Sequence, residues 1–192
     1  MKKLILMAAV MLSSVAAMAQ HAVGTFSIQP KVGLNIANIT KGEGTSTRVG
    51  VATGAEFEYQ AADIVSVSFG ALYSMQGCKG DLNGVDATAK LDYINVPILA
   101  NVYVTKGLAV KLGVQPGFKV NGEWKAEAGN ASATMKDDNF KSFDFSIPIG
   151  LSYEYSNFVL DARYNFGCTK IYEDSDSKNS VFQITLGYKF AL

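Results

Sequence analysis

The sequence of 192 residues is poor in the side chains on which most enzymes depend. It holds a single histidine, His21, and two cysteines, which argues against a histidine-based metal site or a serine–histidine nucleophile. Charged residues make up 18% of the chain, below the roughly 25% usual in soluble domains. The 17 basic and 17 acidic residues balance, and nucleic-acid-binding proteins carry a basic surplus instead. We therefore expect no enzyme, cofactor, metal or nucleic-acid partner.

The sequence also lacks a candidate transmembrane helix. An unbroken apolar run, residues 4–12, follows Lys2 and Lys3 and precedes the small residues of Ala17-Met18-Ala19. A positive start, a short apolar stretch and a small-x-small site are typical of a secretory signal peptide. No later segment reaches the roughly 18 consecutive apolar residues of a membrane-spanning helix. We expect residues 1–19 to be a signal peptide and residues 20–192 to form one domain.

What the sequence has in abundance is alternation with period two. From Phe182 to Leu192, apolar or aromatic residues alternate with polar or small ones, which predicts a strand with two different faces. In another alternating segment, residues 90–104, the phase slips near Tyr93, which indicates a β-bulge. The same alternation predicts seven further strands, in residues 26–36, 49–59, 65–75, 90–104, 108–120, 143–155 and 158–167.

The predicted connections alternate in length along the chain. Three are short, at residues 61–63, 105–107 and 156–157. Four are longer and polar, at about residues 40–47, 78–88, 122–140 and 173–180. In an up-and-down arrangement, all long loops then emerge at one end of the fold and all short turns at the other.

Two closed barrels fit eight alternating strands. A lipocalin-like carrier hides its apolar face around a ligand, whereas a membrane barrel turns that face toward lipid. The polar face here is crowded with glycines, which fit a narrow axis better than a water-facing surface. Aromatic residues, Trp124 among them, gather near the strand ends, as in interfacial girdles. We predict an all-β fold, an eight-stranded antiparallel up-and-down transmembrane β-barrel, with the soluble carrier of an apolar ligand as the alternative.

One internal segment and the C-terminus carry a family resemblance. Residues 91–99, with the sequence LDYINVPIL, together with the signal peptide and the eight strands, resemble the PorT-like small barrels of the porin family in Bacteroidetes-type bacteria. That resemblance implies a location in the outer membrane, among its lipids. The C-terminus is similar to the signal read by the barrel-assembly machinery, which implies that machinery as a partner. The residues that carry this similarity are Gly187, Tyr188, Phe190 and Leu192.

Charged residues on the polar face must lie inside the predicted barrel. Isolated buried charge is very costly, and eight strands leave an interior just wide enough for side chains. We therefore expect a polar network that closes the lumen, with a narrow small-solute channel as the alternative. The candidate residues are Lys31, Glu56, Glu58, Lys111, Lys119, Asp144, Glu154, Asp161, Arg163 and Lys189.

The long-loop end is the candidate surface for partners. We expect a structural or surface-interaction role, with an unknown extracellular ligand bound through the loops. Cys78 and Cys168 lie near this end, and an oxidising compartment permits a disulfide between them. Their strands are far apart around a closed ring, so only loops that fold inward would let the bond form.

Overall fold

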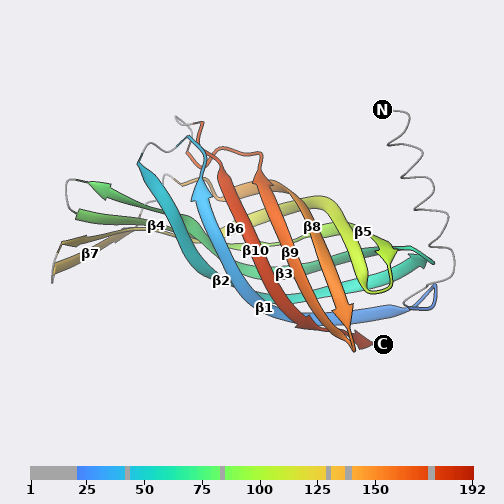
Figure 1. Ribbon diagram of the computed structural model, residues 1–192. Coiled ribbons are helices and arrows are strands. Elements are labelled where there is room, and N and C mark those ends of the chain that lie inside the picture. The colour runs from blue at the N-terminus through green and yellow to red at the C-terminus, as the bar shows by residue number, and fades with distance from the viewer. Residues whose placement is uncertain (1–20, 42–43, 83–84, 129–130, 137–139, 173–175) are drawn as a thin grey trace, which may run out of the picture.

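The computed structural model describes residues 21–41, 44–82, 85–128, 131–136, 140–172 and 176–192. The predicted signal peptide, residues 1–19, lies outside the described residues. No helix among the described residues is long and apolar enough to cross a membrane. The described residues form a single connected sheet, which Figure 1 shows as a barrel with two hairpins projecting from one end. The C-terminus lies at the opposite end of the barrel.

The strands follow one another along the chain with antiparallel neighbours throughout. Their bounds are β1 (Phe26–Ile39), β2 (Thr45–Ala62), β3 (Val65–Leu82), β4 (Val85–Asn95), β5 (Ile98–Thr105), β6 (Leu108–Ala128), β7 (Ala131–Lys136), β8 (Phe143–Tyr155), β9 (Phe158–Gly167), β10 (Asn179–Tyr188) and β11 (Phe190–Ala191).

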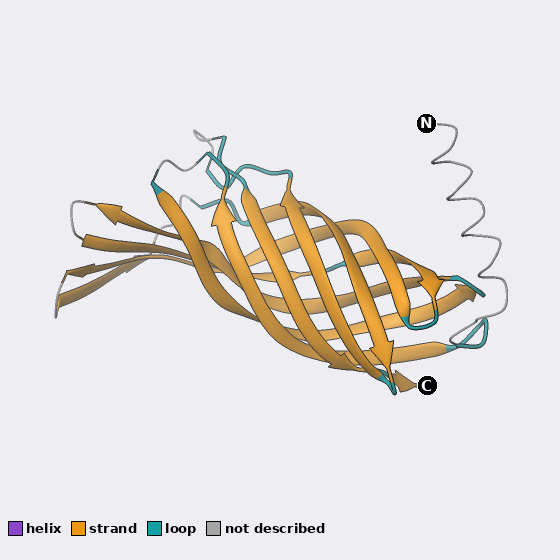
Figure 2. Cartoon of the chain, viewed as in Figure 1, coloured by secondary structure: helices purple, strands orange, loops and turns teal. Residues whose placement is uncertain are grey.

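The sheet closes on itself through β1 and β10. These strands pair antiparallel, with Leu34 opposite Ile184, and the order around the ring continues through β9, β8, β6, β4, β3 and β2. β4 and β5 form one wall interrupted at residues 96–97, β11 continues the wall of β10, and β7 lies outside the ring and pairs with β6. The predicted eight-stranded up-and-down barrel is thereby confirmed, and Figure 2 shows its strands sloping across the barrel axis.

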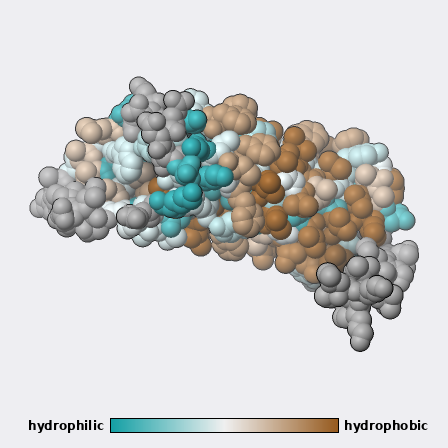
Figure 3. Space-filling view, turned by 90° about the horizontal axis from the view of Figure 1, so that it is seen from above, coloured by the Kyte–Doolittle hydropathy of each residue, from teal (hydrophilic) through white to brown (hydrophobic). Residues whose placement is uncertain are grey.

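The apolar face of the barrel points outward. Along β10, Ile184 and Leu186 are 40% and 51% exposed, whereas Gln183 and Thr185 between them are buried. Figure 3 shows the apolar residues gathered over the barrel, with more polar residues toward the end that carries the hairpins. A soluble carrier would have the reverse arrangement, so the alternative of a lipocalin-like carrier is wrong.

Two of the four predicted long loops are extended strands instead. β3 continues to Leu82 and β4 begins at Val85, so residues 78–88 form most of a hairpin. β6 likewise continues to Ala128 and pairs with β7, in a segment predicted to be a polar loop. Beyond the barrel rim neither face needs to be apolar, so the alternation ends although the backbone hydrogen bonds continue.

The local irregularities match the sequence in two places. The β4–β6 register shifts between Asp92 and Tyr93, which confirms the predicted bulge. The turn between β8 and β9 places Ser156 and Asn157 at positive φ, 47° and 71°, as a two-residue hairpin requires.

Candidate functional site

A cluster of five charged side chains fills the middle of the lumen. Asp161, which has no exposed surface, lies 2.7 Å from Lys111 Nζ and 2.9 Å from Arg163 Nε. Glu56 accepts from Lys31 Nζ at 2.7 Å and from Arg163 Nη2 at 2.8 Å. Four strands, β1, β2, β6 and β9, contribute these residues. The cluster thus links walls on different sides of the barrel.

A second charged cluster lies toward the short-turn end. Lys189 Nζ is 3.0 Å from Glu58 and 2.8 Å from Glu154. The Tyr103 hydroxyl donates to Glu58. His21, which precedes β1, lies at this end of the barrel with Nε2 3.0 Å from Glu154 Oε1. The histidine therefore covers the charged cluster from outside the barrel.

The two clusters are electrically balanced because four cations face four carboxylates. Each of these charged groups lies within 4 Å of an opposite charge, which offsets the cost of removing it from water. All the predicted network residues except Lys119 and Asp144 belong to these clusters. The cations are Lys31, Lys111, Arg163 and Lys189, and the carboxylates are Glu56, Glu58, Glu154 and Asp161.

Lys119 and Asp144 lie apart from these clusters. Lys119 pairs with Tyr93 across β4 and β6, close to the hairpin end, where its ammonium donates to the carbonyl oxygen of Phe140. Asp144 is buried and accepts a hydrogen bond from Thr169 Oγ1 at 2.9 Å. Both residues point inward as predicted, but they are too far along the barrel axis to join the ion pairs.

Sequence reasoning missed a further ion pair nearer the hairpin end. Arg48 and Asp92 are both buried, and Arg48 Nη1 lies 3.7 Å from Asp92 Oδ1. Arg48 keeps the phase of β2 but lies one residue before the predicted start of that strand. Asp92 was hidden by the phase slip at the bulge. Extending each alternating pattern until the phase breaks would have found Arg48.

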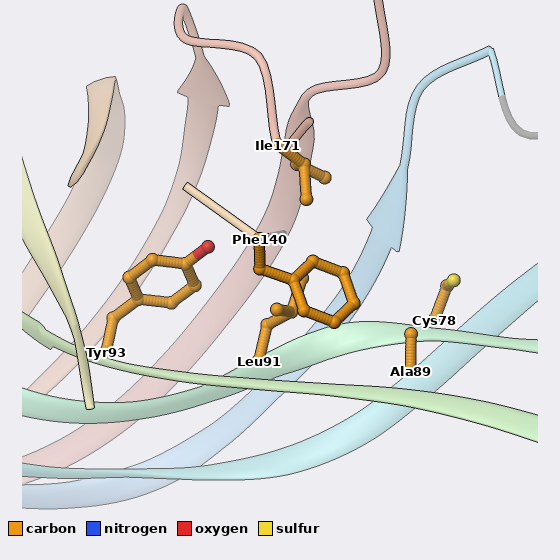
Figure 4. Close-up of a cluster of buried hydrophobic side chains, with 6 residues drawn as sticks. All are labelled: Cys78, Ala89, Leu91, Tyr93, Phe140 and Ile171. Carbon is orange, nitrogen blue, oxygen red and sulfur yellow. The ribbon is translucent and has the colours of Figure 1, made fainter. Parts of the chain in front are cut away.

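The mouth of the barrel at the hairpin end is closed by apolar side chains. Phe140, between β7 and β8, and Ile171, between β9 and β10, are 2% and 3% exposed. They pack on Ala89, Leu91 and the neighbouring inward residues of β3 and β4, and Figure 4 shows Phe140 and Ile171 directed toward Leu91. The connections thus fold into the mouth instead of standing away from it.

Trp124 belongs to this cluster and not to an interfacial girdle. Its indole Nε1 donates to the Tyr172 hydroxyl at 3.1 Å, and its ring stacks on Phe140 with centroids 6.0 Å apart. The prediction placed Trp124 at the membrane interface because it assumed that the residue lies at a strand end. β6 instead continues past the rim, where its inward face is covered by the connections.

The two cysteines are free thiols in the structure. Cys78 on β3 is buried in the apolar cluster, and Cys168 after β9 is exposed. β3 and β9 are not neighbours in the ring, and the connections that fold inward bring Phe140 and Ile171, not Cys168, toward Cys78. The disulfide that the sequence left open is therefore not formed.

Hydrogen bonds join the connections at the hairpin end to one another. The amide of Lys141 donates to the Ile171 carbonyl at 2.9 Å, and the Thr40 amide donates to the Lys178 carbonyl at 2.9 Å. Lys170 Nζ lies 2.8 Å from Asp176, and the hydrogen bond and charge of Lys170 lower the pKa of this exposed carboxyl. The connections after β1, before β8 and before β10 therefore support each other across the mouth.

Nothing in the described part of the chain resembles a catalytic or metal centre. Among the described residues, no group of three or more His, Cys, Asp or Glu side chains is placed to hold a metal ion. The carboxylates of the two charged clusters are bound by lysine and arginine within the barrel.

An apolar exterior around a closed eight-stranded ring with internal ion pairs defines a small integral β-barrel of the outer membrane. Residues 18–173 match the family described as outer membrane protein beta-barrel domain. The chain belongs to this family, and the protein is an outer-membrane β-barrel protein. The comparison with curated protein sequences finds no match.

Two solved structures show the same fold. Ail, the attachment invasion locus protein of Yersinia pestis, solved with the heparin analogue sucrose octasulfate, is 17% identical, with a TM-score of 0.54 over 88% of this chain and 100% of that chain. Neisserial surface protein A is 15% identical, with a TM-score of 0.51 over 86% of this chain and 97% of that chain. At these identities the likeness concerns the fold.

Proposed function

We propose that the protein is a non-enzymatic, closed barrel that holds an extracellular β-sheet as a binding platform for other proteins. The observation that carries the proposal is the continuation of β3, β4 and β6 past the barrel rim, where β7 extends the sheet. Paired strands hold their shape better than single loops, so the platform is rigid and projects from the membrane (Figure 1).

The free edge of this platform is β7. Within the described residues β7 pairs with β6 alone, so one row of its backbone groups faces outward. Directly opposed residues of an antiparallel pair alternate between exchanging hydrogen bonds and facing away from each other, and we infer that Ala128 and Ala131, the last described pair of β6 and β7, are of the hydrogen-bonded kind. By alternation, the backbone groups of Ser132, Thr134 and Lys136 then point away from β6. An exposed edge of this kind recruits extended segments by strand addition.

The test is a proline at the open edge. Peptides selected by phage display on the protein in lipid nanodiscs are expected to bind wild type and Thr134→Ala, which keeps the amide. They should lose at least tenfold in affinity for Thr134→Pro, which removes an outward amide without removing a bond to β6. Equal binding to both variants would show that the edge is not the docking site.

The closed lumen separates this proposal from the alternative of a narrow small-solute channel. The balanced ion pairs and the apolar mouth both occupy the lumen, which supports a barrel that does not conduct. In planar bilayers we expect no stable openings from the wild-type protein. Sustained nanosiemens-scale conductance would favour the channel instead.

We also propose that residues 1–19 direct export and that the C-terminus directs assembly by the barrel-assembly machinery. Tyr188, Phe190 and Leu192 are exposed on the outer surface near the short-turn rim, where an external factor could read them, and Gly187, directly before Tyr188, faces inward. Phe190→Ala should lower the fraction of heat-modifiable, folded protein in the outer membrane while leaving refolding of the purified chain in detergent unchanged. A loss in both experiments would indicate a role in stability instead.

The PorT-like assignment is the finer level of the family proposal. It rests on the segment of residues 91–99, in which Leu91 and Tyr93 face inward and Pro97 interrupts the wall between β4 and β5. The proposal of a binding platform includes an extracellular ligand that is bound through this platform.

A further inference from the structure

We propose that the extracellular mouth contains a binding pocket for a free, uncharged compound with a single aromatic ring. The pocket has a volume of about 120 Å³. Its lining residues come from strands and connections that meet only in the folded barrel: Ile39, Ala89, Leu91, Trp124, Phe140, Ile171, Tyr172 and Ser177.

The pocket is a cavity in an otherwise well-packed apolar cluster. Leu91 and Ala89 on β4 form its floor at 1% and 2% exposure, while Phe140 and Ile171 approach from two separate connections. Packed protein interiors contain few voids larger than a water molecule. Apolar voids hold water poorly because water needs two or more polar partners there. An apolar ligand is therefore the chemistry that the pocket favours.

Aromatic side chains dominate the walls of the pocket. The rings of Phe140 and Tyr172 lie with centroids 4.5 Å apart and planes at 35°, and Trp124 stacks on the same phenylalanine. A further ring can add to this group by stacking or by an edge-to-face contact. None of the described residues that line the pocket carries a charge, so an ionised ligand would lose its hydration without compensation.

The size of the pocket limits the ligand to one ring. An apolar cavity of about 150 Å³ in another protein binds benzene, and the pocket here is slightly smaller. A fused two-ring compound would have to displace Ile171 or Tyr172.

The walls are held in place by hydrogen bonds that the lining residues make with one another and with Lys119. Trp124 Nε1 donates to Tyr172, the Lys119 ammonium donates to the carbonyl of Phe140, and the Ile171 amide donates to the Ser177 carbonyl at 2.9 Å. A pocket formed before the ligand arrives loses less conformational freedom on binding.

The single tryptophan of the chain provides a site-specific signal. Phenol is titrated into the ¹⁵N-labelled protein in lipid nanodiscs, with empty nanodiscs in the reference titration to correct for partitioning into lipid. We expect the one indole N–H resonance to shift saturably, with a dissociation constant of roughly 1 mM, as suits a ligand of seven heavy atoms. Cyclohexanol, of similar size but without an aromatic ring, should bind at least threefold more weakly.

Two variants change the size of the pocket in opposite directions. Ala89→Leu fills the floor and should abolish saturation, whereas Ala133→Leu, the same change at an exposed site on β7, should leave it unchanged. Ile171→Ala enlarges the pocket and should admit 2-naphthol, which wild type excludes. Heat-modifiable gel mobility establishes that each variant is folded, and the enlarged variant keeps the test decisive if the filled one fails to fold.

A capped Gly-Tyr-Gly peptide distinguishes a free compound from a ring carried by a protein. Because two connections cover the pocket, we expect the peptide to bind more weakly than phenol. A linear, non-saturating shift with phenol, equal binding by Ala89→Leu, or tighter binding of the peptide would each overturn the proposal. The platform on β7 does not enter this experiment, so the result does not depend on strand addition.

Discussion

At the scale of single residues, the barrel depends on Asp161. This buried carboxylate lies within 4 Å of Lys31, Lys111 and Arg163, so its loss leaves cations inside the lumen without full compensation. Removing one partner of a buried ion pair costs about 3–5 kcal/mol. We expect Asp161→Asn to lower the free energy of unfolding in lipid vesicles by about that amount, as measured by urea titration.

The matched control is Asp176→Asn, which makes the same change at an exposed ion pair with Lys170. Exposed pairs contribute little to stability, so this variant should unfold like wild type. Equal unfolding of the two variants would mean that the ion pairs fill the lumen without stabilising it.

The sequence predicted which side chains point into the lumen but not which partners they have there. The inward direction of Lys31, Glu56 and Arg163 follows from alternation alone, because period two fixes which face a strand residue occupies. Their partners do not follow, since pairing depends on the stagger between strands that are distant in sequence. Trp124 was misplaced for a related reason, as nothing in the alternation shows where the membrane ends and the projecting sheet begins.

At the scale of elements, the seam between β1 and β10 closes the barrel through a close backbone approach at Gly33. A Cβ atom on Gly33 would lie 1.9 Å from the Ile184 carbonyl oxygen and 2.5 Å from the Thr185 Cα. Neither backbone atom can move without separating the strands. We expect Gly33→Ala to destabilise the barrel by about 1–3 kcal/mol, seen as loss of the folded gel band at a lower temperature.

Gly80→Ala serves as the control for this element. Gly80 lies on the projecting part of β3, where a Cβ would meet only the Gly44 oxygen at 3.8 Å. This variant should keep the melting temperature of wild type. A similar loss in both variants would indicate that glycine acts through general strand propensity and not through the seam.

The number of wall strands and the short turns were predictable because each has a local signature. The hairpins formed by β3 with β4 and by β6 with β7 were not, because the period-two alternation of the sequence ends at the barrel rim and their projecting parts carry no such signal. Their strands are specified by pairing with neighbours, as in the register of β6 with β7. Chain connections that fold into the mouth, such as the one that carries Phe140, have no local signal either.

At the scale of the whole molecule, the outward apolar band determines where the protein can reside. Leu34 is 54% exposed in the middle of this band, opposite Ile184 and Val51. Val23, before β1, is 53% exposed but lies outside the strands. If both side chains faced water, a lysine would be tolerated equally well at position 34 and at position 23. In a bilayer, only a lysine at position 34 would place its charge in hydrocarbon. We expect Leu34→Lys to cost about 2–4 kcal/mol of unfolding free energy in vesicles and Val23→Lys to cost almost nothing. If both variants kept wild-type stability in vesicles, the exposed band would not be in contact with lipid.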